Sequence, residues 1–269
     1  MMDVVVPLLH SLPAEPLPDC GETTSRLARR ALRPYVLGYG GFRTRVDGRL
    51  RRRMLPLTVT TVIVDFAGPG GWVTGPRSVH AVHELAEWRH GVAIGLTPAG
   101  VSALLGVPVP ELVGATVRPD ALLGRRAAEL ADRLGSAPGW PQRFALLDDL
   151  LATWLRPDRP PEDAVTRAWW RLQRPVRAVG EVAAGLGMSR RGLELGFRRH
   201  VGMSPKTVAR IGRLQHAVHR LGRPGAALAL ATDCGYADQP HLSREVRAMT
   251  GLTPTELFAF LQDLRRTAN

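Results

Sequence analysis

The sequence predicts an α+β protein in which a mixed, β-containing amino-terminal domain precedes an all-α domain with two helix-turn-helix motifs. The first half contains Leu55 to Phe66 (LPLTVTTVIVDF), a stretch dense in β-branched residues and therefore typical of a strand. Arg156 to Asp163 (RPDRPPED) has the composition of an exposed linker, and the apolar spacing after it is helical throughout. We therefore expect one domain over residues 1–155, a linker over 156–164 and a second domain over 165–269.

Two short patterns continue the first domain. Val92 to Leu96 is an apolar run of strand length. Thr97 and Pro98 then suit an N-cap followed by proline at the first helical position, which predicts a helix that ends at Gly106.

Two longer helices are expected before the linker. The first spans Asp120 to Leu134 and is closed by Gly135, and the second runs from Trp140 to Leu155 before Pro157 ends it. The second helix places four apolar side chains on one face: Phe144, Leu147, Leu151 and Leu155. That face either packs into the core, which is the usual role, or pairs protomers as a dimer surface.

The second domain contains an internal repeat. Val182-Ala183-x-x-x-Gly187-Met188 matches Leu230-Ala231-x-x-x-Gly235-Tyr236 at an offset of 48 residues. A second set matches at an offset of 49: Leu193, Phe197, Arg198, Gly202, Met203, Ser204 and Pro205 pair with Leu242, Val246, Arg247, Gly251, Leu252, Thr253 and Pro254. The two units are therefore expected to have the same local structure.

Each unit predicts a short helix, a tight turn through glycine, and a second helix capped by Ser189 or Asp238. Apolar residues four positions apart anchor the second helix, which leaves its other face for a partner. The side chains of the two outward faces suit base edges and phosphates. They are Ser189, Arg190, Arg191, Glu194, Arg198 and Arg199 in the first unit, and Gln239, His241, Ser243, Arg244 and Arg247 in the second.

Between the units, Lys206 to Leu221 is expected to form one helix, about 24 Å long at 1.5 Å per residue. Such a spacer would set the two second helices apart by a distance suited to successive major-groove segments, which lie about 34 Å apart on one side of a duplex.

The distribution of charge favours a polyanionic partner. The chain carries 36 basic and 24 acidic residues, a net charge of +12, and every basic residue except Lys206 is arginine. Residues 165–269 hold 17 basic and 7 acidic groups, whereas residues 1–164 hold 19 and 17. The charge is thus concentrated on the second domain, which is the electrostatic signature of nucleic-acid binding, although an anionic membrane surface would attract the same field.

Residues from about 165 to 260 resemble the DNA-binding domain of AraC/XylS-type transcription regulators, through GMSRRGLELGFRRHVGMSPK (187–206) and CGYADQPHLSREVRAMTGLTP (234–254). The first half resembles an uncharacterised domain common in actinobacterial regulators, through LRPYVLGYGGF (32–42), LTPAGVSALLGVP (96–108) and APGWPQRFALLDDLL (137–151). The resemblance implies a cytoplasmic DNA-binding regulator with base contacts in both second helices.

The sequence departs from that family at four positions. Gly192, Leu195 and Gly196 stand where relatives tend to carry polar or basic side chains, and each glycine lowers helix propensity by about 1 kcal/mol. Val246 replaces the usual phenylalanine anchor. The first unit is therefore expected to read fewer bases.

A histidine- and glutamate-rich segment, HAVHELAEWRH, holds His80, His83, Glu84, Glu87 and His90. On a helix the first four would share a face as metal ligands, but the spacing matches neither HExxH nor HxxEH. The segment also leads into the strand at Val92, where alternation would divide the cluster between two faces. We therefore expect a polar strand or loop and no metal site or cofactor.

The remaining features favour a non-enzymatic cytoplasmic protein. Cys20 and Cys234 cannot form a disulfide framework, no export signal or membrane span is indicated, and no catalytic motif stands out. The predicted partner is double-stranded DNA, with a small-molecule effector acting through the first domain, RNA polymerase if the protein activates, and homodimerisation left open. Two alternatives are a metal-binding or enzymatic first domain targeted to DNA, and an architectural protein that binds DNA by charge alone.

Overall fold

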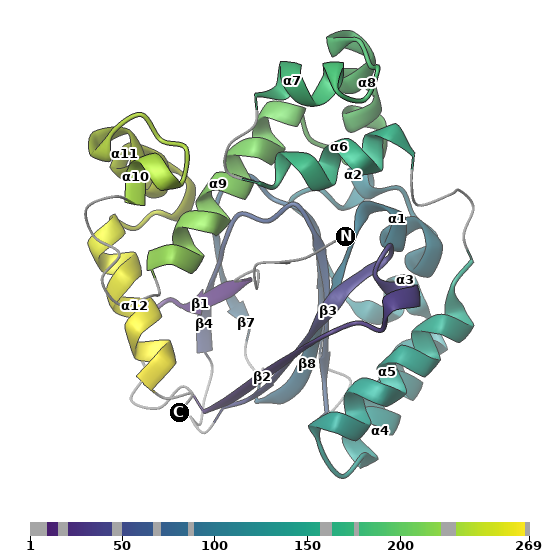
Figure 1. The fold of residues 1–269 in the computed structure, drawn as a ribbon. Coiled ribbons are helices and arrows are strands. Elements are labelled where there is room, and N and C mark those ends of the chain that lie inside the picture. The colour runs from purple at the N-terminus through teal and green to yellow at the C-terminus, as the bar shows by residue number, and fades with distance from the viewer. Residues whose placement is uncertain are drawn as a thin grey trace.

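The structure is a computed structural model that describes residues 10–15, 21–44, 50–66, 71–85, 89–156, 163–174, 178–221 and 230–266. In these ranges the strands all lie in the first half of the chain, and residues 163–266 form helices only (Figure 1). The α+β class with an all-α second part is therefore confirmed. Most of the expected linker, residues 157–162, lies outside the described residues.

The strands form two antiparallel sheets. The smaller sheet consists, in order across it, of β1 (Ser11–Pro13), β4 (Leu50–Met54) and β7 (Ala81–Leu85). The larger sheet consists of β2 (Glu22–Leu27), β3 (Val36–Arg43), β8 (His90–Leu96), β5 (Thr60–Asp65), β6 (Gly71–Thr74) and β9 (Thr116–Val117).

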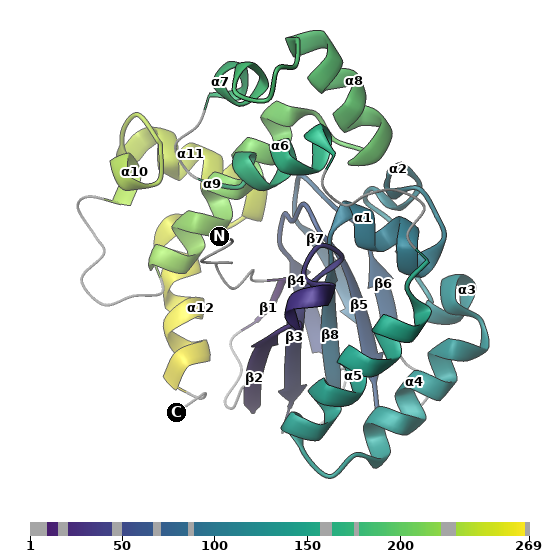
Figure 2. The same cartoon turned by 45° about the vertical axis from the view of Figure 1, so that its right-hand side comes forward.

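The helices form two groups. The long helices of the first half, α4 (Arg125–Ser136) and α5 (Trp140–Trp154), lie on one face of the larger sheet (Figure 2), and the other group makes up the second half of the chain. Those of the first half are η1 (Arg30–Leu32), α1 (Pro98–Gly100), η2 (Val101–Leu105), α2 (Val109–Leu112), α3 (Pro119–Leu123), α4 and α5. Those of the second half are α6 (Ala164–Leu172), α7 (Val179–Ala184), α8 (Arg190–His200), α9 (Pro205–Leu221), α10 (Leu230–Asp233), α11 (Gln239–Thr250) and α12 (Pro254–Arg266).

The alternation of β5 divides its side chains between two cores. Val62 and Val64 join the apolar cluster that includes residues of α4 and α5, whereas Ile63 packs with Met54 of the smaller sheet. Successive side chains of a strand point to opposite faces, so one strand contributes to both layers.

The space between the sheets also holds polar groups. The imidazole Nε2 of His10 lies 2.8 Å from Oγ1 of Thr74, and Nε of Arg52 donates a hydrogen bond to Oγ of Ser11 over 3.0 Å. Burial and the nearby charges of Arg52 and Arg77 lower the pKa of His10 to about 3. His10 is consequently neutral at physiological pH.

The strand expected over Leu55 to Phe66 is shorter in the structure. Only Thr60–Asp65 forms β5, and Leu57 instead makes an isolated antiparallel bridge with Arg77. Leu55, Leu57 and Val59 are buried in the core of the helical second half, so this segment leaves the sheet to pack against helices. The strand expected at Val92 to Leu96 is confirmed within β8.

The helix expected from Pro98 to Gly106 begins and ends as predicted. Oγ1 of Thr97 accepts a hydrogen bond from the amide of Gly100 over 3.1 Å, and Gly106 closes the helix with a φ of 70°. Its second part, η2, is a π-helix rather than an α-helix.

The single helix expected from Asp120 to Leu134 is wrong, because Gly124 divides it. Gly124 has φ 55° and ψ −134°, a conformation outside the helical region that separates α3 from α4. Gly135, expected to close the helix, lies within α4, which ends at Ser136.

The helix expected from Trp140 to Leu155 is confirmed as α5. Phe144, Leu147 and Leu151 are buried in the amino-terminal core, and Leu155 packs against it. Between core packing and a dimer surface, the structure therefore assigns this face to the core.

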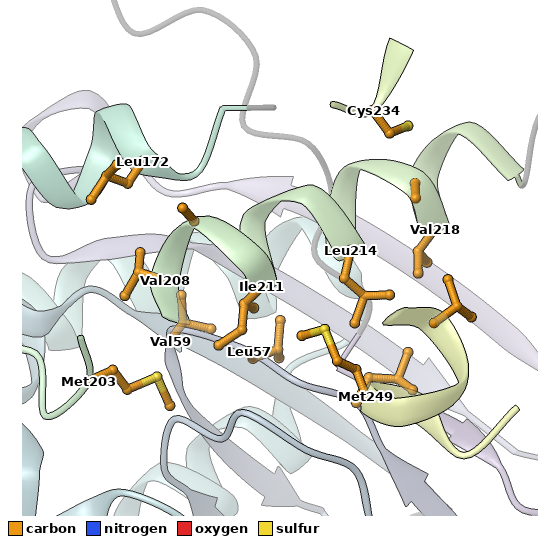
Figure 3. Packing of buried hydrophobic residues seen from close by; sticks show 14 of the residues in the cluster. Leu57, Val59, Leu172, Met203, Val208, Ile211, Leu214, Val218, Cys234 and Met249 are labelled. Atoms are coloured by element: carbon orange, nitrogen blue, oxygen red, sulfur yellow. The ribbon is translucent and has the colours of Figure 1, made fainter. Parts of the chain in front are cut away.

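The two halves of the chain share one apolar cluster. Val208, Ile211 and Leu214 of α9 lie in the same cluster as Leu57 and Val59 (Figure 3). Hydrogen bonds join the same surfaces. Nε2 of Gln215 donates to the carbonyl oxygen of Pro56 over 2.9 Å, and Oγ1 of Thr58 donates to Oε1 of Gln173 over 2.8 Å. The spacer helix is thus fixed on the amino-terminal part of the molecule.

Candidate nucleic-acid interface

Two helix-turn-helix units are present, α7 with α8 and α10 with α11. The turns contain Gly187 with φ 65° and Gly235 with φ 76°, values that favour glycine. Each second helix is capped as predicted. The amide of Gly192 donates to Oγ of Ser189 over 3.0 Å, and the amide of His241 donates to Oδ1 of Asp238 over 2.7 Å.

The first unit anchors α8 by Leu193 and Phe197, which are fully buried. The exposed residues of the predicted set are Ser189, Arg190, Arg191, Arg198 and Arg199. Glu194 is partly buried, and its Oε1 lies 3.3 Å from Nε of Arg198 as an i,i+4 ion pair. The outward face of α8 is therefore basic, with one carboxylate that orients an arginine.

Gly196 is explained by packing rather than by the outward face. A Cβ at this position would meet Cγ2 of Val165 in α6 at 2.6 Å. The glycine allows α6 and α8 to approach, which the sequence pattern did not indicate.

The second unit anchors α11 by Leu242, Val246 and Met249. The valine at 246 is fully buried, so it retains the anchoring role of the larger residue. Pro240 lies in the first turn of α11, where proline is tolerated. The predicted residues that are exposed here are Gln239, Arg244 and Arg247, and Ser243 is partly buried.

His241 differs from the other predicted residues because it is engaged within the unit. Its ring packs edge-on against Tyr236 with 5.4 Å between centroids, and its Nδ1 lies 3.4 Å from the amide nitrogen of Ala237. Its imidazole therefore packs on the turn that precedes α11.

Three residues missed by the sequence reasoning hold α11 on the spacer helix. Nε of Arg210 lies 2.7 Å from Oε1 of Glu245, and Nη2 of Arg213 lies 3.7 Å from Oε2 of the same carboxylate. The guanidinium of Arg213 also lies over the ring of Tyr236, 5.7 Å from its centroid. The spacing of Arg210 and Arg213, three apart on one helix, was the available signal.

The amino-terminal part contacts the turn that follows each second helix. After α8, a Cβ on Gly202 would lie 2.5 Å from Cγ2 of Val113 and 3.0 Å from Cα of Pro110. At the end of α11, the amide of His80 donates to the carbonyl oxygen of Met249 over 2.8 Å, and a Cβ on Gly251, just after the helix, would lie 2.7 Å from the ring of His80. Both turns therefore rest on the first half of the chain.

The arginines that precede Met54 have different surroundings. Arg51 is exposed, but Nη1 of Arg53 donates to the carbonyl oxygen of Thr250 over 3.1 Å, and Nε of Arg52 donates to Oγ of Ser11 in β1. Arg49 lies outside the described residues. Strand alternation explains why neighbouring arginines of β4 have different partners.

The described histidine and glutamate residues of this segment lie apart, because β7 and β8 belong to different sheets and His80 precedes β7. His80 contacts the turn after α11, Glu84 lies 3.8 Å from Nε of Arg51, and the ring of His90 packs edge-on against Phe66. Glu87 lies outside the described residues. Within the part of the chain that the structure describes, no three histidine, cysteine or acidic side chains gather as metal ligands.

Cys234 is buried in the core of the second half, where burial raises its thiol pKa to about 11. It is therefore a packing residue and not a reactive thiol. Cys20 lies outside the described residues.

A pocket of about 420 Å³ lies between the two halves of the chain. Its amino-terminal wall comes from Tyr35, α1, η2 and the segment Gly106–Val109, and its other wall contains Asp163, Thr166, Arg199 and His200. The last two residues belong to the end of α8. The pocket is thus lined both by the first helix-turn-helix unit and by the amino-terminal part.

Residues 182–259 match the family described as helix-turn-helix domain. This region is a helix-turn-helix domain. Domains of this kind place their second helix in the major groove of double-stranded DNA. The match spans both repeat units, from Val182 in α7 to Ala259 in α12.

The chain aligns along most of its length with solved structures of ToxT from Vibrio cholerae. A P21 crystal form gives a TM-score of 0.46 at 10% identity, covering 94% of this chain and 97% of that chain. The structure from strain O395 gives 0.43 at 9% identity with the same coverage. No curated protein matches the sequence.

In the parts of the chain that the structure describes, no helix is long and apolar enough to cross a membrane.

Proposed function

We propose that the protein is a sequence-specific regulator of transcription that binds double-stranded DNA through α8 and α11. The observation that carries the proposal is the paired geometry of these helices. Each is capped at its start, anchored by buried apolar residues, and basic on its outward face. Two such helices on one chain suit a bipartite site in successive major-groove segments.

The spacer helix supports a fixed separation between the two readers. The 17 residues of α9 span about 25 Å at 1.5 Å per residue. The ion pairs of Glu245 hold α11 on α9, and the shared apolar cluster fixes α9 on the amino-terminal part. The half-site spacing is then set by a rigid unit and not by a flexible tether.

The exposed arginines of α8 and α11 can make two kinds of contact with DNA. An arginine that reaches a base edge forms a bidentate pair with guanine, whereas one that reaches the backbone neutralises a phosphate. We assign base reading to Arg191 and Arg244, which are exposed in the amino-terminal half of their helices, and phosphate contact to Arg199 and Arg247. Arg198 forms an ion pair with Glu194, and neither task is assigned to it.

Selection of bound duplexes from a random library tests the proposal. At physiological salt, the wild-type protein should enrich a motif with two halves, and Arg244→Ala should relax one half while the other is kept. Arg125→Ala is the matched control, because Arg125 is an exposed arginine on α4. Binding without enrichment, which fades uniformly as salt rises, would identify a charge-driven architectural protein instead.

We further propose that a small molecule modulates DNA binding through the pocket between the halves. The pocket is lined by the amino-terminal part and by Arg199 and His200 at the end of α8, so a ligand there contacts both. A ligand that binds one arrangement of α8 better than another shifts DNA affinity by the same factor that DNA shifts ligand affinity.

The pocket can be tested before its ligand is known. Ser102 lines the pocket and is exposed, so Ser102→Trp should fill the space without unfolding the protein. A metabolite mixture that raises the Tm of the wild type should then have no effect on Ser102→Trp. Equal stabilisation of both proteins would place the ligand elsewhere.

A further inference from the structure

Leu195 is the centre of the outward face of α8. Its exposed fraction is 58%, the largest among the exposed large apolar residues of the described chain. Leu193 and Phe197, by contrast, are fully buried. Each residue turns an α-helix by about 100°, so the side chain two positions from each anchor points away from the core.

A single exposed leucine is common on protein surfaces, so its position matters more than its exposure. Arg191 lies one turn before it and Arg198 one turn after it, and both are exposed. Gly192, three positions before Leu195, has no side chain of its own, and a Cβ there would meet only Oγ of Ser189, at 3.1 Å. The face is therefore an apolar tip between two cations.

The second unit carries the opposite chemistry at the same place. The repeat offset of 49 that pairs Leu193 with Leu242 and Phe197 with Val246 also pairs Leu195 with Arg244. Both residues are exposed at the same position relative to their anchors. The two helices therefore present leucine and arginine to equivalent points of their sites.

The base edges of the major groove offer one apolar group, the C5-methyl of thymine, whereas guanine offers two acceptors that suit arginine. We infer that Leu195 makes α8 specific for a thymine through its C5-methyl group, at the position where α11 uses Arg244 to read guanine. This inference rests on the proposed function, since it names the base that one recognition helix selects.

Replacement of thymine by deoxyuridine isolates the methyl group, because base pairing is unchanged. In the enriched motif, each thymine of the half-site assigned to α8 is replaced singly, and binding of the full-length protein is measured. Loss of one buried methyl should weaken wild-type binding about 4-fold at one thymine. The variant Leu195→Ala should bind the thymine and deoxyuridine duplexes equally, and thymines of the other half-site should respond alike in both proteins.

An exchange of side chains gives the second test. Since Arg244 occupies the equivalent position, Leu195→Arg should change the preferred base at that one position from thymine to guanine. Leu195 is exposed, so both variants should retain the wild-type Tm.

The outcomes separate this inference from the proposed function. Failure of the wild type to enrich any motif would overturn the proposed function and the inference with it. Enrichment of a two-part motif in which no thymine depends on its methyl group and on Leu195 would overturn the inference alone. A methyl effect that persists in Leu195→Ala would assign thymine reading to another residue and would also overturn it.

Discussion

Nη1 of Arg53 donates a hydrogen bond to the carbonyl oxygen of Thr250 over 3.1 Å, across 197 positions of sequence. The bond joins β4 to the end of α11. Beside it, a Cβ on Gly251 would lie 2.7 Å from the ring of His80, so the sheet and the turn are in close contact. The amino-terminal part is thereby in direct contact with the end of α11.

Removal of the Arg53 guanidinium should destabilise this contact. We expect Arg53→Ala to lower the free energy of unfolding by about 1–2 kcal/mol, because a partly buried carbonyl oxygen loses a charged donor. Arg51→Ala is the control on the same strand. Arg51 is exposed and pairs only with surface carboxylates in the described chain, so its loss should cost less than about 0.5 kcal/mol. Denaturant unfolding checks both, and equal costs would contradict a specific role for Arg53.

Gly202 should tolerate alanine worse than Gly187 does. Both have positive φ, 74° and 65°, but a Cβ on Gly202 would meet Val113 at 2.5 Å, whereas one on Gly187 meets nothing within 4 Å. Gly187→Ala should therefore cost about 1 kcal/mol for backbone strain alone, and Gly202→Ala about 1–3 kcal/mol more. Unfolding curves give the difference. If the two variants were equally stable, the contact between the α8–α9 turn and Val113 would not contribute to the free energy of unfolding.

Neutralisation of Glu245 should loosen α11. The carboxylate is largely buried and faces Arg210 and Arg213, so Glu245→Gln leaves two cations without their negative counter-charge. We expect a loss of about 1–3 kcal/mol in the free energy of unfolding. Glu194→Gln removes an exposed i,i+4 pair and should cost less than about 0.5 kcal/mol. A similar loss in both would show that the ion pairs of Glu245 are no stronger than a surface pair.

The pKa of His10 predicts a pH dependence of stability. Burial, with Arg52 and Arg77 nearby, lowers this pKa from 6.5 to about 3, so between these values the unfolded chain binds a proton that the native protein rejects. The contribution of His10 is complete above pH 6.5 and falls as pH drops toward 3, by about 1.4 kcal/mol per pH unit. His10→Gln should flatten the curve in that window. The histidines at 83 and 90, whose pKa values burial also lowers, remain in both proteins and cancel in the difference. Parallel curves would contradict the assignment.

The sequence predicted the helix-turn-helix units well because their determinants are local. Ser189 and Asp238 cap helices whose amides lie three residues away, and Gly187 and Gly235 shape turns within a few residues. The two faces of α8 and α11 follow from a period of 3.6 residues. Anchors and exposed arginines could therefore be assigned before any tertiary contact was known.

Prediction failed where distant parts of the chain decide. The residues from Leu55 to Val59 leave a strand pattern to pack against α9, whereas the break between α3 and α4 comes from the positive φ of Gly124 itself. A run rich in β-branched residues can pair within a sheet or pack in extended form against the apolar side of a helix. Composition alone did not distinguish these two arrangements.

The sequence by itself determined the two repeated units, their caps and the chemistry of their outward faces, including leucine in one and arginine in the other. Only the tertiary structure decided that Arg53 reaches Thr250, that Gly202 rests on Val113, and that the histidines of one segment separate. Helix periodicity and capping act over three or four residues, so the linear order contains them. Contacts between residues so far apart in the sequence depend on how the sheets and helices pack, which no local pattern specifies.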